Sequence, residues 1–566
     1  MPDEPIPTSE QSPDLPSEPV DNIPSPGQTL TPQDPSPPAP TEATTAEQAP
    51  PTVQQPTKPR SKKWLVITIV LIVIIIAAVL AAVVLKSNNK TATVTKKDIP
   101  LLTYGYYGGG EIPQYPVTYL YVNVDVDIAM QMFEGLVGYQ NQTKVVPLLA
   151  TSWSTPNDNT WVFNLRHNVK FNTGRTMTAQ DVKYSLDYAV AHQNDDSGDS
   201  AFLYLADDIK QTTVTGAYQV TVTTTNPDAV LLNQLGLIGI VDSKAKPGDY
   251  SAGTGPYVVK PGTTPTDSTI DLVASNNYWG GHVYTRELKI SIYTSQDKMA
   301  TDMANGKLDL AGFFTASTLS KIKNYQPINI PEQGFEFLGL NTERADSPLH
   351  SVVARQALAY ALNVPNILKA AGYQGQQASQ IVPLLLPGHN PAIQNVPYDP
   401  AKAKQLLASA TNANATITFG YPNGDGTEAS EISKELDAVG FNIKTVENDD
   451  FSSYVNDAIA GQYDIYIEGD TSATVDGLDL LTDELEGNQT YDNPQIDSLI
   501  TQAGGTLNAA TRINDMQQVA TIVSNDKPII PLYTITQAYA LTKPYVVKSD
   551  LPDLAVSAYF WQVYQK

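Results

Sequence analysis

The sequence predicts a mixed α/β protein of two or three globular units behind one N-terminal transmembrane helix. At 566 residues the chain is too long for a single hydrophobic core. From Ile99 onward, strand and helix patterns alternate irregularly without a repeat of fixed period, which favours mixed α/β lobes over a solenoid or a propeller. Residues 64–85 are apolar except for Thr68, which is the pattern of a membrane span.

The first 57 residues are expected to form no folded unit. They hold Pro at high density with Asp, Glu, Ser, Thr and Gln, and they contain no Lys or Arg and almost no large apolar residue. Such a segment cannot bury enough surface to offset the entropy of ordering it. We expect residues 1–57 to be a disordered, acidic, Pro-rich cytoplasmic tail, either simply solvated or presenting polyproline to a partner.

The apolar run from Trp64 to Leu85 has the length that crosses a hydrocarbon core of about 30 Å at about 1.5 Å per residue. The small residues that a signal peptidase needs lie inside this run, which favours an uncleaved anchor over a cleaved signal peptide. The basic residues on its N-terminal side predict a cytoplasmic N terminus. These are Lys58, Arg60, Lys62 and Lys63. We therefore expect a single-pass protein of the cell membrane, with residues 86–98 as a polar stalk and the ligand-binding part outside the cell.

Composition excludes several functions. The chain has no cysteine, so disulfides, thiolate nucleophiles and Cys-ligated zinc are ruled out. Its net charge of −24 argues against nucleic acid and anionic lipid as partners, because phosphate binding needs a basic face.

Local patterns predict individual elements. Alternation of apolar and polar residues predicts a strand pair, Trp161–Leu165 and Val169–Phe171, around a turn. A helix is expected after Thr178 as N-cap, with Asp181 three residues on. Tyr463–Ile467 is expected to be a strand. Three later helices should begin where a capping residue precedes proline, at Ser347-Pro348, Asp399-Pro400 and Asn493-Pro494.

Motifs for catalysis or metal binding are missing from the sequence. The five histidines are scattered, and neither a nucleophile elbow nor a phosphate loop occurs. Residues 123–134 match a calcium loop at Asn123, Asp125, Asp127 and Glu134, but Ile128 stands where the loop needs glycine, and the alternation from Tyr119 to Val126 predicts a strand. A glycosidase-like carboxylate pair stays open because carboxylates are abundant. We expect no enzyme, no cofactor and no metal site.

Phrases spread over residues 99–545 resemble the family 5 extracellular solute-binding proteins of ABC importers, the oligopeptide and dipeptide binders. They include an E-G-L-V turn, a P-L-L-A-T-S-W segment, a long F-N-L-R block and a G-T-G-P-Y turn, followed by N-N-Y-W-G, N-G-K-L-D, L-G-L-N-T and R-Q-A-L-A-Y-A. Their positions are Glu134–Val137, Pro147–Trp153, Phe163–Leu186, Gly253–Tyr257, Asn276–Gly280, Asn305–Asp309, Leu338–Thr342 and Arg355–Ala361.

The resemblance implies a two-lobed, type II periplasmic-binding-protein-like ectodomain with an extra subdomain. By resemblance, lobe 1 comprises residues 99–335 plus 537–566, with the subdomain inserted at about 135–250, and lobe 2 comprises residues 336–536. The chain is expected to cross between lobes near 334–337 and 531–536. The implied function is capture of an oligopeptide or similar small solute by hinge closure and its delivery to an ABC permease with its ATPase. Members are typically tethered by a lipidated cysteine, which the transmembrane helix would replace.

The resemblance also suggests ligand-binding residues on both lobes. In peptide binders, a phrase like G-W-x-x-D-Y supplies an Asp that pairs with the peptide's amino terminus. The corresponding stretch here, 469–476, has no Trp and a displaced Asp, so Asp470 or Asp476 takes that role, or the ligand has no free amine, or both residues belong to a solvated loop. The residues expected to bind ligand are Tyr104, Tyr106, Tyr107, Glu111, Asn341, Glu468, Asp470, Thr471, Ser472 and Asp476.

Two other functions stay open. The ectodomain could sense a peptide and signal through the cytoplasmic tail, or it could be a surface hydrolase that uses paired carboxylates. Fold alone does not separate these functions, because function resides in the site.

Overall fold

The computed structural model describes residues 96–107, 125–140, 144–192, 206, 208–246, 248–266, 268–331, 334–472, 474–486, 489–546 and 560–565. The predicted tail, the predicted membrane span at 64–85, most of the stalk and Glu111 lie outside these residues. Among the described residues, no helix combines the length and the apolar character needed to cross a membrane.

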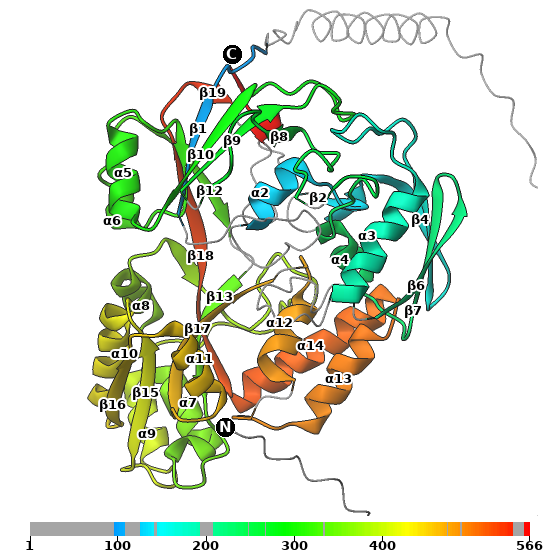
Figure 1. Cartoon of the computed structure of the whole chain (residues 1–566). Helices are drawn as coiled ribbons and strands as arrows, with labels where there is room; N and C mark the ends of the chain where they lie inside the picture. Colours follow the sequence, from blue (N-terminus) through cyan, green and yellow to red (C-terminus); the bar gives the residue numbers. More distant parts are fainter. Residues whose placement is uncertain are drawn as a thin grey trace, which may run out of the picture. The chain divides into compact units, whose positions relative to one another are not determined.

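One large sheet runs through both lobes, with its main path in the order β16-β15-β17-β13-β18-β11-β1-β10-β9-β8 (Figure 1). Strand β18 (Ile529–Leu541) connects the lobes, since its first half pairs with β13 (Gly334–Leu340) and β14 (Gly375–Gln377). Its second half pairs with β11 (Leu310–Ala311) and β12 (Gln326–Pro331). Because β12 leads directly to β13, two antiparallel stretches of chain run side by side from one lobe to the other.

Lobe 1 holds the remaining strands of one end of the large sheet, β1 (Leu102–Tyr107), β8 (Tyr257–Val259), β9 (Thr269–Ala274) and β10 (Glu287–Tyr293). Strand β1 lies parallel to both β10 and β11. Helices α5 (Gln296–Ala304) and α6 (Ala316–Leu319) bury Met299, Met303 and Leu319 against Ala538 and Ala540 of β18. The C-terminal pair β19 (Tyr545–Val546) and β20 (Tyr564–Gln565) and the 3₁₀ turn η2 (Phe560–Gln562) complete this lobe.

A smaller part follows β1 in the chain and begins with α2 (Asp125–Met132). Its four-stranded antiparallel sheet has the order β4-β5-β7-β6, and a separate hairpin pairs β2 with β3. The elements are β2 (Val137–Gln140), β3 (Lys144–Pro147), β4 (Ala150–Asn157), β5 (Thr160–Leu165), α3 (Ala179–His192), β6 (Ile209–Gly216), β7 (Gln219–Thr224) and α4 (Leu231–Leu237).

Lobe 2 builds its part of the large sheet from β13 with β15 (Thr416–Pro422), β16 (Asn442–Asn448) and β17 (Ile465–Thr471). One face is covered by α7 (Val352–Ala361), α8 (Val364–Ala371), α9 (Pro400–Leu407) and α10 (Gly426–Val439), whose apolar residues pack on Leu338, Ile465 and Ile467. On the other side lie α11 (Phe451–Ile459), α12 (Gly477–Leu485), α13 (Pro494–Gly504) and α14 (Ala509–Asp526), which share a core with Phe335, Phe337 and Tyr466.

Several local predictions are confirmed. Thr178 donates from its N–H and its hydroxyl to Asp181 (2.9 and 3.0 Å) at the start of α3. Asp399 and Asn493 cap α9 and α13 with proline at the first helical turn. The strand expected near 463–467 is the start of β17.

Three local predictions are wrong in part. Val169 and Phe171 are buried but form no strand with β5, because Asn168 turns the chain with a φ of 63° and β4 and β7 occupy both edges of β5. Ser347-Pro348 opens a short 3₁₀ turn, η1 (Pro348–His350), and α7 begins only after Ser351. Val126, expected in a strand, lies in α2.

Candidate ligand-binding site

Parallel strands of both lobes end where the lobes meet. In lobe 2, β15 runs parallel to β16 and β17, and the end of β17 at Thr471 pairs with Gly334, where the chain enters from lobe 1. In lobe 1, β1 is parallel to β10 and β11. Ala311 ends β11 and pairs with Ala540, which is one residue nearer to lobe 2 along β18 than Leu541. Ligands of open α/β sheets bind outside the carboxyl ends of such strands. Both sets of ends therefore form the candidate site.

Of the three expected lobe 1 residues that the structure describes, Tyr107 reaches this edge. It is the last residue of β1. The pKa of Tyr373 in lobe 2 is raised to about 12, first by burial, then by three nearby carboxylates and last by Tyr107, so Tyr107 lies near lobe 2. Tyr104 and Tyr106 instead point into the core, each 2% exposed. Their rings pack on Phe560 and Phe313 at centroid distances of 4.9 and 5.6 Å.

Glu468 and Asp470 stand on one face of the end of β17, opposite Phe337 and Phe335 of β13. Burial, and then the charge of Asp470, raises the pKa of Glu468 to about 7. Burial also raises the pKa of Asp470, although the N–H of Thr471 donates to its Oδ1 at 2.7 Å. Within the described part of the chain, no Lys or Arg forms an ion pair with either carboxylate.

Helix α12 brings two further acids to this face that the sequence did not single out. Burial and then the charge of Asp470 raise the pKa of Asp483 to about 6. Burial, followed by the charges of Glu468 and Asp470, raises the pKa of Glu484 well above its usual range. Four acidic side chains thus gather beside the end of β17, and their mutual repulsion makes an approaching cation favourable there.

A second acidic group lies on the opposite face of the same strand end. Glu336 of β13 covers Gly469, where an added Cβ would come within 2.4 Å of the Glu336 carboxylate. Tyr533 of β18 pairs with Glu336 across the two strands. The Tyr533 hydroxyl donates to both carboxylate oxygens of Glu428, at 3.0 and 2.9 Å. Burial raises the pKa of Glu428 to about 7, and the charge of Asp425 adds to the shift. Glu428 lies in the first turn of α10, where acidic residues are common in helices. The sequence therefore gives no signal that Glu428 pairs with Tyr533.

The loop after β17 is tied to lobe 2 by its own hydrogen bonds. Ser472 donates its hydroxyl to Asp479 (2.9 Å) and accepts from the N–H of Asp476 (3.0 Å). Asp476 caps α12 by accepting from the N–H of Leu478 at 3.0 Å, and its carboxylate also forms an ion pair with Arg512. Asp476 is therefore already neutralised by a cation of the protein, in contrast to Asp470.

Asn341 lies at the far end of β13. It donates to the carbonyl of Gly461 (3.1 Å) and accepts from the N–H of Glu343 (3.1 Å). It lies seven positions along the chain from Gly334, about 23 Å in an extended strand. Of the expected binding residues, the structure thus brings Tyr107, Glu468, Asp470 and Thr471 to the meeting edge of the lobes, places Ser472 and Asp476 in the next loop, and places Tyr104, Tyr106 and Asn341 elsewhere.

The recognised phrases converge on a different centre, the buried carboxylate of Glu134. It accepts hydrogen bonds from Thr254 and Trp279 at 2.7 Å each and from Tyr278 at 3.3 Å. Burial raises its pKa to about 7 against the lowering effect of these donors. Arg166 stacks on the Trp279 ring at 4.4 Å. These donors make Glu134 a structural residue, whereas Asn123 of the calcium-loop match lies outside the described residues. Among the residues that the structure describes, no cluster of potential metal ligands occurs.

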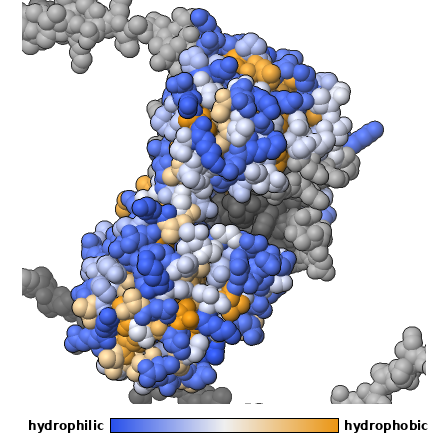
Figure 2. Space-filling view, turned by 90° about the vertical axis from the view of Figure 1, so that its left-hand side faces the viewer, coloured by the Kyte–Doolittle hydropathy of each residue, from blue (hydrophilic) through white to orange (hydrophobic). Residues whose placement is uncertain are grey.

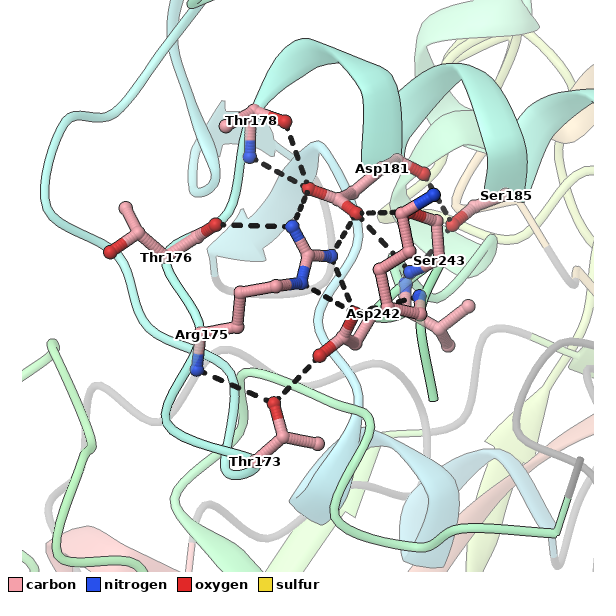
Figure 3. A network of polar contacts seen from close by, with 10 residues as sticks. Thr173, Arg175, Thr176, Thr178, Asp181, Ser185, Asp242 and Ser243 are labelled. Atoms are coloured by element: carbon pink, nitrogen blue, oxygen red, sulfur yellow. Dashed lines mark hydrogen bonds and ion pairs between the residues drawn. The ribbon is translucent and has the colours of Figure 1, made fainter. Parts of the chain in front are cut away.

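The long phrase ends in an ionic network that anchors α3 (Figure 3). Arg175 bonds Asp181 through both terminal nitrogens and Asp242 through Nε (2.6 Å). Thr173 donates to Asp242 (2.7 Å), and Ser243 donates to Asp181 (2.7 Å). Burial alone would raise the pKa of both carboxyls, but the Arg175 guanidinium and the hydroxyl donors hold each pKa below its usual value.

Two relatives match half of the chain or more. The heme-binding protein A of Haemophilus influenzae is 29% identical over 461 residues, covering 71% of this chain and 82% of that protein. The dipeptide-binding protein of Escherichia coli is 28% identical over 315 residues, covering 50% of this chain and 58% of that protein.

Solved structures show the same fold. HbpA2 from Haemophilus parasuis matches with a TM-score of 0.71 at 22% identity, over 82% of this chain and all of that one. DppA from Helicobacter pylori, in complex with the peptide STSA, matches with a TM-score of 0.66 at 19% identity, over 83% of this chain and 98% of that one. The fold is therefore the two-lobed α/β fold of periplasmic binding proteins.

A family description, bacterial extracellular solute-binding proteins, family 5 Middle, matches residues 144–491. Members of this family are binding proteins rather than enzymes. With its two lobes, its connecting strands and this match over more than half of its length, the chain belongs to the family 5 bacterial extracellular solute-binding proteins.

Proposed function

We propose that this protein is a membrane-anchored extracellular solute-binding protein that captures an oligopeptide, or a similar small solute with a free amine, and delivers it to an ABC permease. The capture step is closure of lobe 2 (336–536) on lobe 1 (99–335 plus 537–566), with residues 334–337 and 531–536 absorbing the rotation. A ligand that contacts both lobes binds the closed form better and so shifts the equilibrium toward it.

The pair Glu468 and Asp470 is the observation that supports a free amine on the ligand. Both carboxyls lie at the meeting edge of the lobes with raised pKa values, and no Lys or Arg of the described residues pairs with them. A ligand ammonium placed here would relieve their repulsion and form charge-assisted hydrogen bonds. Asp470 is favoured over Asp476 for this role because Arg512 already pairs with Asp476.

The relatives support a small solute as cargo. A dipeptide-binding protein and a heme-binding protein are both among them, so the family name alone leaves the ligand open. A peptide satisfies both features of the site, because its amino terminus matches the acids and its main chain can pair with exposed strand ends. The membrane anchor rests on the apolar run 64–85, which has the length of a span.

The test begins with ligand carried through purification. The full chain, purified gently and then denatured, should release a ladder of peptide masses in mass spectrometry. A released peptide is then resynthesised with a free and with an acetylated amino terminus, and both forms are titrated calorimetrically against ligand-free protein. The free-amine form should bind about 10-fold to 100-fold more tightly, the range of one hydrogen bond to a charged group.

A matched pair of variants assigns the amine. Asp470→Asn should abolish the preference for the free amine, whereas Asp492→Asn, which removes the same charge from an exposed position, should preserve it. Equal affinity of the wild-type protein for both peptide forms would rule out the amine contact. Release of only a sugar or a metal would remove peptide as the ligand class.

A further inference from the structure

The end of lobe 1 where the described chain begins and ends carries a basic and aromatic cluster. We call it the terminal surface and define it by Lys96, Lys97, His282, Tyr284 and Tyr564. The backbone of Lys97 exchanges two hydrogen bonds with Gln565, at 2.8 and 3.0 Å. The first and last described segments are therefore joined, and Figure 1 shows β19 and the start of β1 at the same end of the lobe.

The cluster is ordered by ring contacts. The Lys96 ammonium lies 5.1 Å from the Tyr284 ring centre and 4.7 Å from that of Tyr564, and the two rings are 5.7 Å apart. The His282 ring packs on Tyr284 at 4.8 Å. Lys96, Lys97 and His282 are exposed, and both tyrosines are half-buried, so the lysine side chains and part of each tyrosine reach solvent.

Two exposed lysines, Lys96 and Lys97, carry positive charge at this surface of an acidic protein. The chain has a net charge of −24, yet residues 86–97 contain Lys86, Lys90, Lys96 and Lys97 and no acid. Asp98, the first acid after them, is engaged by His282 Nε2 at 2.6 Å. An anionic lipid surface repels an acidic protein, and the protein can approach that surface only with a side on which lysines cluster.

Chain length limits how far this surface can lie from a membrane. Only ten residues, 86–95, separate Leu85 from Lys96, and ten fully extended residues span at most about 36 Å. Tyr side chains favour the headgroup region of a bilayer, and Lys side chains are attracted to anionic headgroups. Figure 2 shows that another face of the protein is mainly hydrophilic with scattered apolar residues, the character of a solvated surface.

From this combination of contacts, charge and chain length, we propose that the terminal surface binds the headgroups of an anionic lipid bilayer. The inference rests on the proposed membrane anchor at 64–85. Lobe 1 is then the lobe held against the membrane, and lobe 2, joined through β12–β13 and β18, is the lobe that rotates when a ligand binds.

The absence of cysteine makes a direct test possible with single labels on the full chain. Gln565→Cys places a fluorophore on the terminal surface, and Ala401→Cys places the same fluorophore on exposed helix α9 of lobe 2. Each labelled protein is reconstituted in vesicles of phosphatidylcholine and phosphatidylglycerol, with brominated phosphatidylcholine as quencher. Flotation of the vesicles measures anchoring independently of quenching.

We expect at least threefold stronger quenching at position 565 than at 401. The difference should disappear in the double variant Lys96→Glu and Lys97→Glu, and it should shrink in vesicles without anionic lipid. Co-flotation with equal quenching at both positions would overturn the proposal while leaving the anchor intact. Failure to co-float would overturn the anchor itself, and the proposal with it.

Discussion

Arg175 neutralises two buried carboxylates at once, so its replacement should be among the most destabilising single changes in the subdomain. The side chain of Asp181 is 0% exposed and that of Asp242 is 4% exposed. Methionine at position 175 keeps much of the side-chain volume but leaves both acids without their cation. Breaking a buried ion pair from one side costs about 3–5 kcal/mol, so Arg175→Met should lower the free energy of unfolding by that amount.

Urea unfolding at pH 7, followed by tryptophan fluorescence, measures this loss, because Trp161 is buried in β5 of the sheet on which α3 packs. Lys183→Met is the matched control, since Lys183 pairs with Asp187 on the surface at 38% and 47% exposure. A pair of this kind contributes about 0–1 kcal/mol.

A triple variant tests the cause of the loss. Arg175→Met combined with Asp181→Asn and Asp242→Asn removes both charges together with their partner, and it should recover part of the lost stability. A cost below about 1 kcal/mol for Arg175→Met alone, equal to that of the surface control, would refute the reasoning.

Three further outcomes follow from other contacts. Burial raises the pKa of Glu134 from 4.5 to about 7, so its contribution to stability is complete below about pH 4.5 and is lost as the pH rises through about 7. Glu134→Gln should therefore flatten the pH dependence of unfolding between pH 5 and pH 8 by about 3 kcal/mol, and an unchanged slope would contradict this. Asp399→Ala removes the acceptor for the N–H of Lys402 (2.9 Å) and should cost about 1 kcal/mol in urea unfolding, whereas Asp399→Ser should cost less. Gly253→Ala places a Cβ 2.1 Å from the Met132 carbonyl oxygen, so overpacking should lower the free energy of unfolding by about 1–3 kcal/mol. An unchanged free energy of urea unfolding would show that the Met132 backbone moves aside and would contradict this expectation.

Elements whose determinants are local could be predicted from the sequence. The N-terminus of α3 follows from Thr178 and Asp181 three residues apart, and the starts of α9 and α13 follow from a capping residue before proline. Where the same signal failed, at Ser347-Pro348, the proline still opened a helical turn, but a 3₁₀ turn, and Ser351 took over as the N-cap of α7. Ser347 still caps that turn by accepting from the N–H of Leu349, whereas Ser351 makes no side-chain capping bond, so the start of α7 is not encoded by a capping side chain.

The candidate site was predictable only where it coincides with a strand end. Glu468 and Asp470 follow an apolar run that reads as a strand, so their place at its end could be anticipated. Glu428 and Tyr533 are 105 residues apart and meet because β18 passes beside α10. Such a pair depends on which strands become neighbours, and no period or spacing in the sequence encodes that.

The recognised phrases identify the fold because they build the same buried centre. Glu134, Thr254, Tyr278 and Trp279 come from three phrases, the first of which lies more than a hundred residues before the other two. They meet in hydrogen bonds that hold α2 to the β8–β9 region. None of these residues lies at the end of β17 beside Glu468. The residues that reveal the family are thus those that fix the subdomain on lobe 1, while the acids proposed to meet the ligand stand in a stretch that departs from the family phrase. Recognition of the phrases therefore establishes the two-lobed fold and leaves the ligand to be read from the chemistry of the site.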